Sequence, residues 1–514
     1  MAETPSESDT VAAGIAKAGV EPTLTEVHPN AEDGPFHEDR AAFLSTFSPE
    51  EEKAIMRKVD YRLLALFGVI YMVKQIDVNN AAAVKVLAVG KPTNILTQLD
   101  MTSDEYNWVQ SIYYISYIIF ELPSNLLLKK WTPRIFQARI MFLWGLVLAC
   151  HAAVTNKAGI LTARFFLGLM EAGLFPAIMT QLCSWYRSDE MGKPIAWLFG
   201  IFNLAGVIGS LIVYGIAFLD GRQGLSSWQW VFLLQGVATM AFAFLVWFFC
   251  PDYPRSERTG KWLTPREQKF VEFRLTSNAP VTSDAAFSRK ESLETLKDPR
   301  LWAFMLTQVL MNTGGFGLSW FLPTIITNLG FVGLPRNILL LIPTATVAIL
   351  AIAVAAYILH KAWIPRPIFT ISIVVLEVAV FAIFIATRER GAIYAACILG
   401  TLFSAAFAIP FWSWRTSSLK GTTGTAFAFG LQSGVGQLGG VIGPQIFQSR
   451  YAGDGYRVPY SICTATIGGG LLGCLLCWYL TQKLEQDVRR VQKERIQAEQ
   501  RGQLYTGPDV NVHA

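Results

Sequence analysis

Long apolar runs alternate with short polar segments along most of the chain. A helix that crosses the hydrocarbon core of a membrane needs about 20 predominantly apolar residues, and runs of that length form two sets of six. The first set is Leu63–Val86, Trp108–Leu128, Ile135–Val154, Ala158–Trp185, Pro194–Leu219 and Trp228–Phe249, and the second is Leu301–Ile326, Asn337–Leu359, Pro367–Ala386, Ala392–Trp414, Thr425–Phe447 and Val458–Leu480. The pattern predicts an all-α membrane protein with twelve transmembrane helices.

A polar segment separates the two sets. It carries nine Lys or Arg residues between Arg255 and Lys297 and contains no apolar run. The expected organisation is a disordered cytoplasmic tail over 1–47, an N-terminal six-helix bundle over 48–250, a cytoplasmic central loop over 251–300, a C-terminal six-helix bundle over 301–480 and a cytoplasmic tail over 481–514.

Helix-start signals occur at two polar positions. Ser48 to Glu51 reads Ser-Pro-Glu-Glu, which supplies an N-cap, a proline at the first helical position and a capping-box glutamate. This predicts a short surface helix ahead of the first transmembrane helix, and Thr264 to Glu267 repeats the signal in the central loop. Gln482 to Gln500 alternates charges without an evident apolar face, which is typical of a solvated helix.

Composition and charge support a membrane protein and exclude several other classes. The chain is 52% hydrophobic and 16% charged, which is too apolar for a soluble globular protein. Lys and Arg gather in the central loop and in alternate loops between spans, which lie on the same side of the membrane. Both termini are therefore expected in the cytoplasm. No Walker A, metal-ligand, cofactor or nucleic-acid motif is present. We therefore expect no enzyme activity, no cofactor and no nucleic-acid partner, and a monomer in the plasma membrane.

Charged residues interrupt the predicted spans of the N-terminal half. An ionised group at the centre of a transmembrane helix costs roughly 2.5–3.5 kcal/mol, so such residues mark transport pathways or internal ion pairs. Lys74 and Asp77 lie in the first span, and Arg164 and Glu171 lie in the fourth. Both interpretations of the fourth-span pair stay open. Glu121, near the end of the second span, is expected to be a structural hydrogen-bonding partner.

Depth in the membrane suggests which of these charges meet. At about 1.5 Å per residue, Asp77 and Arg164 fall in the outer layer, whereas Lys74 and Glu171 fall in the middle layer. We therefore expect Asp77 to face Arg164 and Glu171 to face Lys74. The C-terminal half is polar without being charged, and Asn312 and Trp320 of the seventh span are candidates for ligand contact.

Four ordered motifs carry a family resemblance. They are Arg164-Phe-Phe-Leu-Gly-Leu-Met-Glu-Ala-Gly-Leu-Phe-Pro176, Glu121-Leu-Pro-Ser-Asn125, Trp228-Gln-Trp-Val-Phe232 and Pro251-Asp-Tyr-Pro254. Together they resemble the major facilitator superfamily, and more closely the fungal allantoate, nicotinate and pantothenate permease-like group of its anion:cation symporter branch. The resemblance implies two six-helix bundles around a central cavity and movement of substrate by alternating access.

The hypothesis that follows is a proton-coupled symporter of a small organic anion. Lys74 would bind the carboxylate, with Asn79, Asn312 and Trp320 completing the substrate site. Asp77, Arg164 and Glu171 would couple transport to protons. Two alternatives remain: an exporter of a secondary metabolite in the same fold, and a nutrient sensor that does not transport. The fifth span lacks a proline between Gly200 and Gly215, which disfavours the exporter.

Overall fold

The computed structural model describes residues 40, 42–127, 131–187, 190–275, 289–329, 340–419 and 422–502. One folded unit extends from Phe47 to the C-terminus. The predicted tail over 1–47 lies almost entirely outside the described residues, as does the part of the central loop over 276–288. All regular structure in the described ranges is helical, which confirms the predicted all-α fold.

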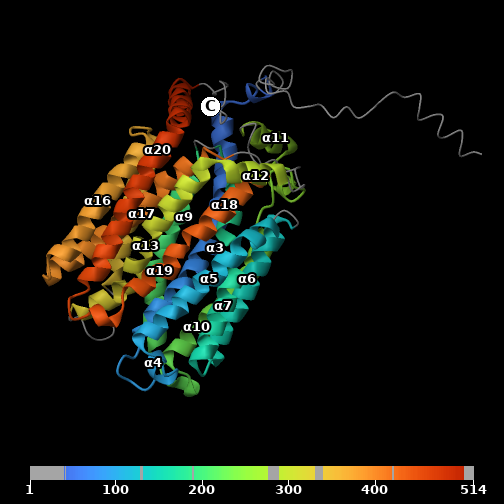
Figure 1. Cartoon of the computed structure of the whole chain (residues 1–514). Helices are drawn as coiled ribbons and strands as arrows, with labels where there is room; N and C mark the ends of the chain where they lie inside the picture. The colour runs from blue at the N-terminus through green and yellow to red at the C-terminus, as the bar shows by residue number, and fades with distance from the viewer. Residues whose placement is uncertain are drawn as a thin grey trace, which may run out of the picture. The chain divides into compact units, whose positions relative to one another are not determined.

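Each of the twelve predicted spans coincides with a helix or with a broken pair of helices (Figure 1). In the first half these are α3 (Pro49–Lys85), α5 (Ser103–Leu127), α6 (Pro133–Cys150), α7 (Lys157–Glu171) with α8 (Leu174–Cys183), α9 (Gly192–Ala217) and α10 (Ser227–Phe249). In the second half they are α13 (Pro299–Asn328), α15 (Leu341–His360), α16 (Arg366–Ala386), α17 (Arg390–Thr416), α18 (Thr422–Gly436) with α19 (Leu438–Ile446), and α20 (Arg457–Gln500).

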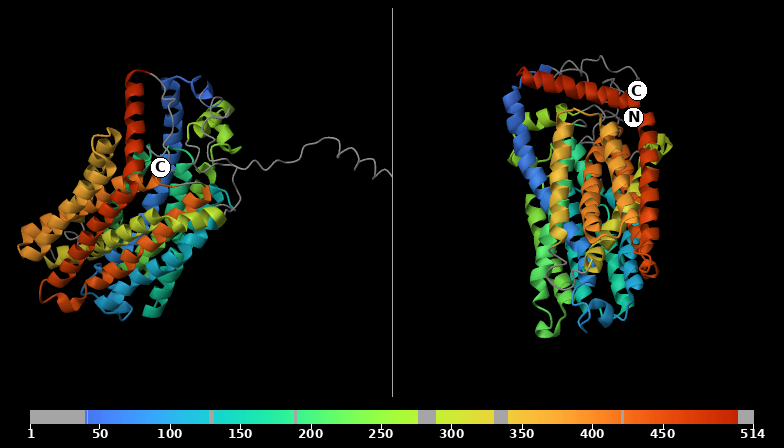
Figure 2. Two further views of the ribbon diagram at one scale, coloured as in Figure 1. Left: turned by 45° about the horizontal axis from the view of Figure 1, so that its top comes forward. Right: turned by 90° about the vertical axis from the view of Figure 1, so that its left-hand side faces the viewer.

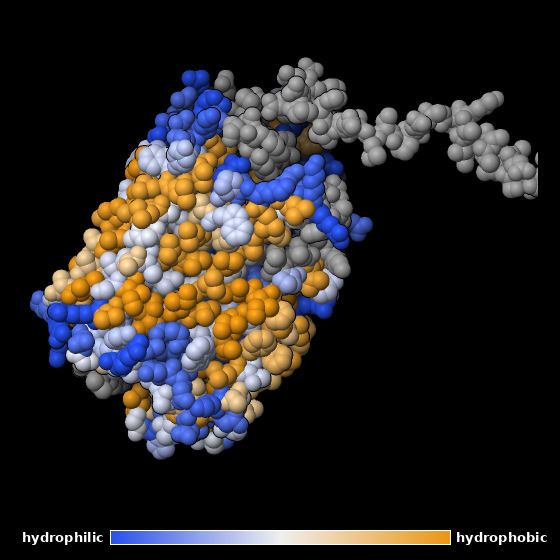
Figure 3. Space-filling model, in the orientation of Figure 1, coloured by the Kyte–Doolittle hydropathy of each residue, from blue (hydrophilic) through white to orange (hydrophobic). Residues whose placement is uncertain are grey.

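Nine of the spans are apolar enough to cross a membrane by length and composition alone, counted over the described residues. The other three are α3, α5 and the pair α18 and α19. Their polar side chains lower the mean hydropathy, and these same helices pack at the centre of the bundle. Hydrophobic side chains cover the middle of the face in Figure 3, and hydrophilic ones gather at its two ends.

The two halves meet along two seams. Helix α5 packs against α18 and α19, and α9 packs against α15. Within the first half, α6 packs against α10 and α3 packs against α9. Within the second half, α13 and α16 both pack against α20. We call the end of the bundle where α3 begins and α20 ends the terminal end. The opposite end, where the short helix α4 (Ile95–Gln98) lies in Figure 1, is the far end.

Both predicted capping boxes are formed, but the first one begins a longer helix than expected. Ser48 and Glu51 cap α3, which continues without a break into the first span. The predicted surface helix leads directly into the first span, because no glycine, proline or turn separates the polar first turns from the apolar run. Thr264 and Glu267 cap α11 (Pro265–Phe273) of the central loop. A second loop helix, α12 (Arg289–Lys297), precedes α13.

The charged segment at the end of α20 also differs from its expectation. It continues the last span as one helix, and Leu484, Val488 and Val491 are buried. Their spacing of four and three residues places them on one narrow face, which the surrounding charges hid in the sequence. The end of α20 reaches the terminal end of α3, where Glu499 pairs with Lys53 at 2.9 Å (Figure 2).

Candidate functional site

A cavity of about 370 Å³ lies between the two halves. Its wall is built by α3, α5, α8 and α9 from the first half and by α13, α15, α17, α18 and α19 from the second. Aromatic rings and uncharged polar groups make up much of the wall. Lys74 is the single charged side chain among the described residues that line it.

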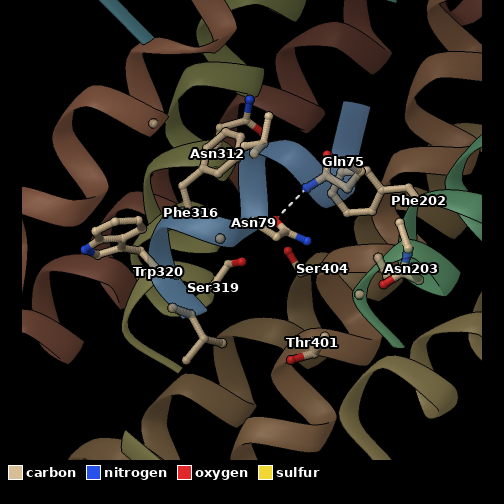
Figure 4. Close-up of a pocket in the computed structure, with 18 of the residues that line it drawn as sticks. Gln75, Asn79, Phe202, Asn203, Asn312, Phe316, Ser319, Trp320, Thr401 and Ser404 are labelled. Atoms are coloured by element: carbon tan, nitrogen blue, oxygen red, sulfur yellow. Dashed lines mark hydrogen bonds between the residues drawn. The ribbon is translucent and has the colours of Figure 1, made fainter. Parts of the chain in front are cut away.

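All four predicted substrate-binding residues lie in the wall of this cavity. Asn79, Asn312 and Trp320 are labelled in Figure 4. Asn79 accepts a hydrogen bond of 2.7 Å from the Gln75 amide on the preceding turn of α3. The Asn312 amide donates to the Gly436 carbonyl at 2.9 Å, which ties α13 to the end of α18. The Trp320 indole N–H donates to Asn107 at 3.0 Å, and its ring lies nearly parallel to that of Tyr106.

Lys74 has no carboxylate partner. Its side chain is 8% exposed, and its ammonium group lies 5.5 Å from the centre of the Tyr117 ring, a cation–π distance. None of the ion pairs in the described part of the chain includes Lys74. The buried carboxyl groups of Glu171 and Glu121 act on this cation electrostatically, but neither forms an ion pair with it among the described residues, so the ammonium group is placed to bind an anion.

The predicted proton-coupling residues lie behind the cavity wall rather than in it. Asp77 accepts hydrogen bonds from the Trp144 indole at 3.1 Å and from the Thr239 hydroxyl at 2.9 Å. Glu171 accepts a hydrogen bond of 2.6 Å from the Tyr113 hydroxyl. All of these side chains are buried. Glu171 ends α7, and the chain then turns at Gly173 with φ of 88° before α8 begins.

The expected direct pairings between these charges are not formed. Arg164 is completely buried, and its three side-chain nitrogens have no hydrogen-bond partner among the described residues. Its guanidinium instead lies 5.2 Å from the centre of the Phe232 ring. Asp77 is turned to α6 and α10, and Glu171 to α5. Residue counting estimates depth along a helix but not the direction in which a side chain points, so equal depth did not imply contact.

Glu121 was expected to be a structural hydrogen-bonding partner, and the Ser433 hydroxyl lies beside it without forming a bond of normal geometry. Neither of its carboxylate oxygens has a hydrogen-bond partner in the described part of the chain, although the side chain is 0% exposed. Glu377 of α16 is in the same situation, with 0% exposure and both oxygens unpartnered within the described residues. The two carboxyl groups differ in position, because Glu121 lies between the halves and Glu377 lies inside one of them, and in charge environment, because, of the two, Lys74 acts on Glu121 alone.

Several wall residues were not predicted. The polar ones include Asn203, Thr401 and Ser404, and Phe202 and Phe316 contribute rings (Figure 4). Asn203 stands within the apolar run of α9, and such an isolated amide is a usable sequence signal. The serines and threonines gave no signal, because a hydroxyl in a membrane helix usually bonds its own backbone, as Thr401 does to the Cys397 carbonyl.

The sequence profile of the Major Facilitator Superfamily matches residues 78–444. The chain belongs to this superfamily. It is accordingly a multi-pass integral membrane transporter, and the cavity between its halves is the candidate substrate site of that transporter.

Curated relatives of this transporter come from fungi. It is 33% identical to the MFS transporter prlL of Fungal sp. (strain NRRL 50135) over 60% of this chain and 62% of that one. It is 28% identical to the MFS-type transporter cnsO of Penicillium expansum over 85% of each chain. The major facilitator-type transporter hxnP of Emericella nidulans is 26% identical over 87% of this chain and 89% of that one.

Solved structures share the fold of this superfamily member. The human organic anion transporter MFSD10 aligns with a TM-score of 0.59 at 13% identity, covering 81% of this chain and 99% of that one. A bacterial homolog of the human lysosomal transporter Spinster, inward-facing and occupied, aligns with a TM-score of 0.56 at 13% identity, covering 82% of this chain and 96% of that one.

Proposed function

We propose that this transporter carries a small organic anion together with protons by alternating access. The observation that supports this most directly is the unpaired Lys74 ammonium, the single charge among the described residues of the cavity wall. A cation held in a largely aromatic and amide-lined cavity favours a ligand with one carboxylate and a compact uncharged body. The cavity volume of about 370 Å³ limits that ligand to a small molecule.

Each predicted residue has a role in this proposal. Lys74 binds the carboxylate, while Asn79 and Asn312 offer amide groups to the rest of the substrate and Trp320 offers its ring. Glu171 or Asp77 carries the proton, and Arg164 lowers the cost of the ionised form from a neighbouring position. A carboxyl group behind the wall interacts electrostatically with the charge in the cavity without contacting the substrate.

The direction of transport follows from the orientation in the membrane. The terminal end carries the basic central loop, so we assign it to the cytoplasm, with both chain termini there. Protons then enter from the far end together with the anion, and both leave at the terminal end. We assign the transporter to the plasma membrane as a monomer.

Uptake measurements test this function. Cells expressing the protein are given labelled nicotinate, pantothenate, biotin, allantoate and short dicarboxylates at acidic and at neutral external pH. We expect concentrative uptake of at least one anion that is faster at acidic pH. Lys74→Gln should abolish it, whereas Lys58→Gln, on the same helix but paired with Glu267 outside the cavity, should not. Uptake that survives Lys74→Gln contradicts the assigned anion site.

A further inference from the structure

Glu121 lies in the seam between the two halves, on the part of α5 that packs against α18. It stands six residues before the end of α5, about 9 Å from the terminal end of that helix. A Cβ atom added to Gly434 of α18 would lie 3.0 Å from the Glu121 Oε2. The two helices therefore touch at the carboxyl group and leave no room for water between them.

The Lys74 ammonium acts on this carboxyl group electrostatically but forms no ion pair with it among the described residues. The Ser433 hydroxyl lies beside it and lines the cavity, yet neither group makes a hydrogen bond of normal geometry in the described residues. The titratable side chains that interact electrostatically with Glu121 are Tyr71 and Lys74 of α3 and Tyr117 of α5. Arg415 of α17 is bound to Gln432 and Ser418 instead.

An ionised carboxylate has a high free energy in a buried seam without water. Without water or a well-aligned donor its charge is only partly compensated by Ser433 and Lys74, whereas the protonated acid is neutral and needs one acceptor at most. The closed seam thus favours the proton-bearing form of Glu121. Opening of the terminal end separates α5 from α18 and exposes the same group to water, where the ionised form is the stable one.

We propose that Glu121 is a proton-dependent latch on the terminal end of the transporter. It stays protonated while the seam is closed, and its O–H bond breaks on opening, with the proton passing to water at the terminal end. This proton site is additional to Glu171 and Asp77. The inference rests on the proposed alternating access, but it requires neither the substrate nor the anion site.

Glu377 provides a matched control. Its carboxyl group is as deeply buried as that of Glu121 and equally without partners among the described residues. Its helix, α16, packs against α17 and α20 of the same half. Glu377→Gln therefore makes the same chemical change in an equally buried position. It lies outside the interface between the two halves, which is the one that opens.

The test measures opening of the terminal end directly. Spin labels are attached to cysteines at Tyr61 of α3 and Lys361 after α15, two exposed positions on different halves, in purified protein whose native cysteines are replaced. The distance between the labels is recorded from acidic to alkaline pH without substrate. Release of one proton on opening makes the ratio of open to closed molecules rise by up to about tenfold per pH unit.

The variants separate the latch from other pH effects. Glu121→Gln should make opening less steeply dependent on pH, because the proton of Glu121 is no longer released, whereas Glu121→Asp should keep the parent's steepness and Glu377→Gln should match the parent. Glu121→Met, of similar size and uncharged, replaces Glu121→Gln if that variant fails to fold. The proposal is overturned if Glu121→Gln opens with the parent's pH dependence, or if Glu377→Gln loses steepness equally. Absence of anion uptake would refute the proposed function and leave this result unaffected.

Discussion

The Trp144 indole of α6 donates a hydrogen bond of 3.1 Å to the Asp77 carboxylate of α3. This bond, together with the one from Thr239 of α10 at 2.9 Å, turns Asp77 away from the cavity and joins three helices of the first half. Hydrogen bonds to a charged acceptor are stronger than neutral ones, so the two contacts fix α3 and offset part of the cost of ionising Asp77 in this buried position.

A double-mutant cycle measures that contact. Trp144→Phe should destabilise the parent more than it destabilises an Asp77→Ala background, with a coupling energy of about 0.5–3 kcal/mol. Thermal unfolding in detergent provides the measurement, and the lost indole packing cancels because it is removed in both backgrounds. Strictly additive effects would mean that the two side chains do not interact in the folded protein.

Glu171 is predicted to carry a coupling proton. Glu171→Gln keeps the shape of the side chain and can still hydrogen-bond Tyr113, but it cannot exchange a proton. Accumulation of substrate against its gradient should be lost, while substrate binding to purified protein is retained. Uptake with the parent's pH dependence in this variant would exclude Glu171 as the carrier.

The Tyr113 hydroxyl is predicted to set the pH range of that coupling. Its hydrogen bond of 2.6 Å to Glu171 stabilises the ionised carboxylate. Tyr113→Phe removes the donor and favours the protonated form, so the decline of uptake with rising pH should move to higher pH. The initial rate of uptake as a function of external pH checks this, and a shift to lower pH would contradict the assigned donor.

Gly168 of α7 is predicted to be intolerant of any side chain. A Cβ atom there would overlap the Tyr113 carbonyl oxygen and the Ser116 hydroxyl of α5. Gly168→Ala should destabilise the protein by about 1–3 kcal/mol through forced separation of two packed helices. Gly215→Ala in α9 is the control, since a Cβ atom there meets nothing within 4 Å. Equal unfolding temperatures for the two variants would contradict the packing of α5 on α7.

The orientation in the membrane predicts the accessibility of tags. Tags fused to the N-terminus and the C-terminus should react only after the plasma membrane of intact cells is permeabilised, because both are assigned to the cytoplasm. A cysteine placed at the exposed Asp454, at the far end before α20, should react from outside without permeabilisation. A terminal tag that reacts in intact cells would reverse the orientation or break the count of spans.

Apolar periodicity and helix-start chemistry along the chain were sufficient to predict the helical spans. The twelve apolar runs coincide with the helices, because a span of hydrocarbon demands a fixed length of apolar residues whatever packs beside it. Ser48 and Thr264 begin helices for an equally local reason, since a capping box needs only residues within one turn. The four candidate wall residues were also found this way, because polar groups in a membrane helix turn from lipid.

Tertiary structure alone decided which side chains meet. Lys74, Asp77, Arg164 and Glu171 were recognised as buried charges, but their partners were not, since Asp77 is held by Trp144 and Glu171 by Tyr113. Residue spacing determines depth and relative angle within one helix, whereas contact between helices depends on how each is rotated and placed against the others. Those rotations result from packing along the whole bundle, which no short segment of the chain encodes.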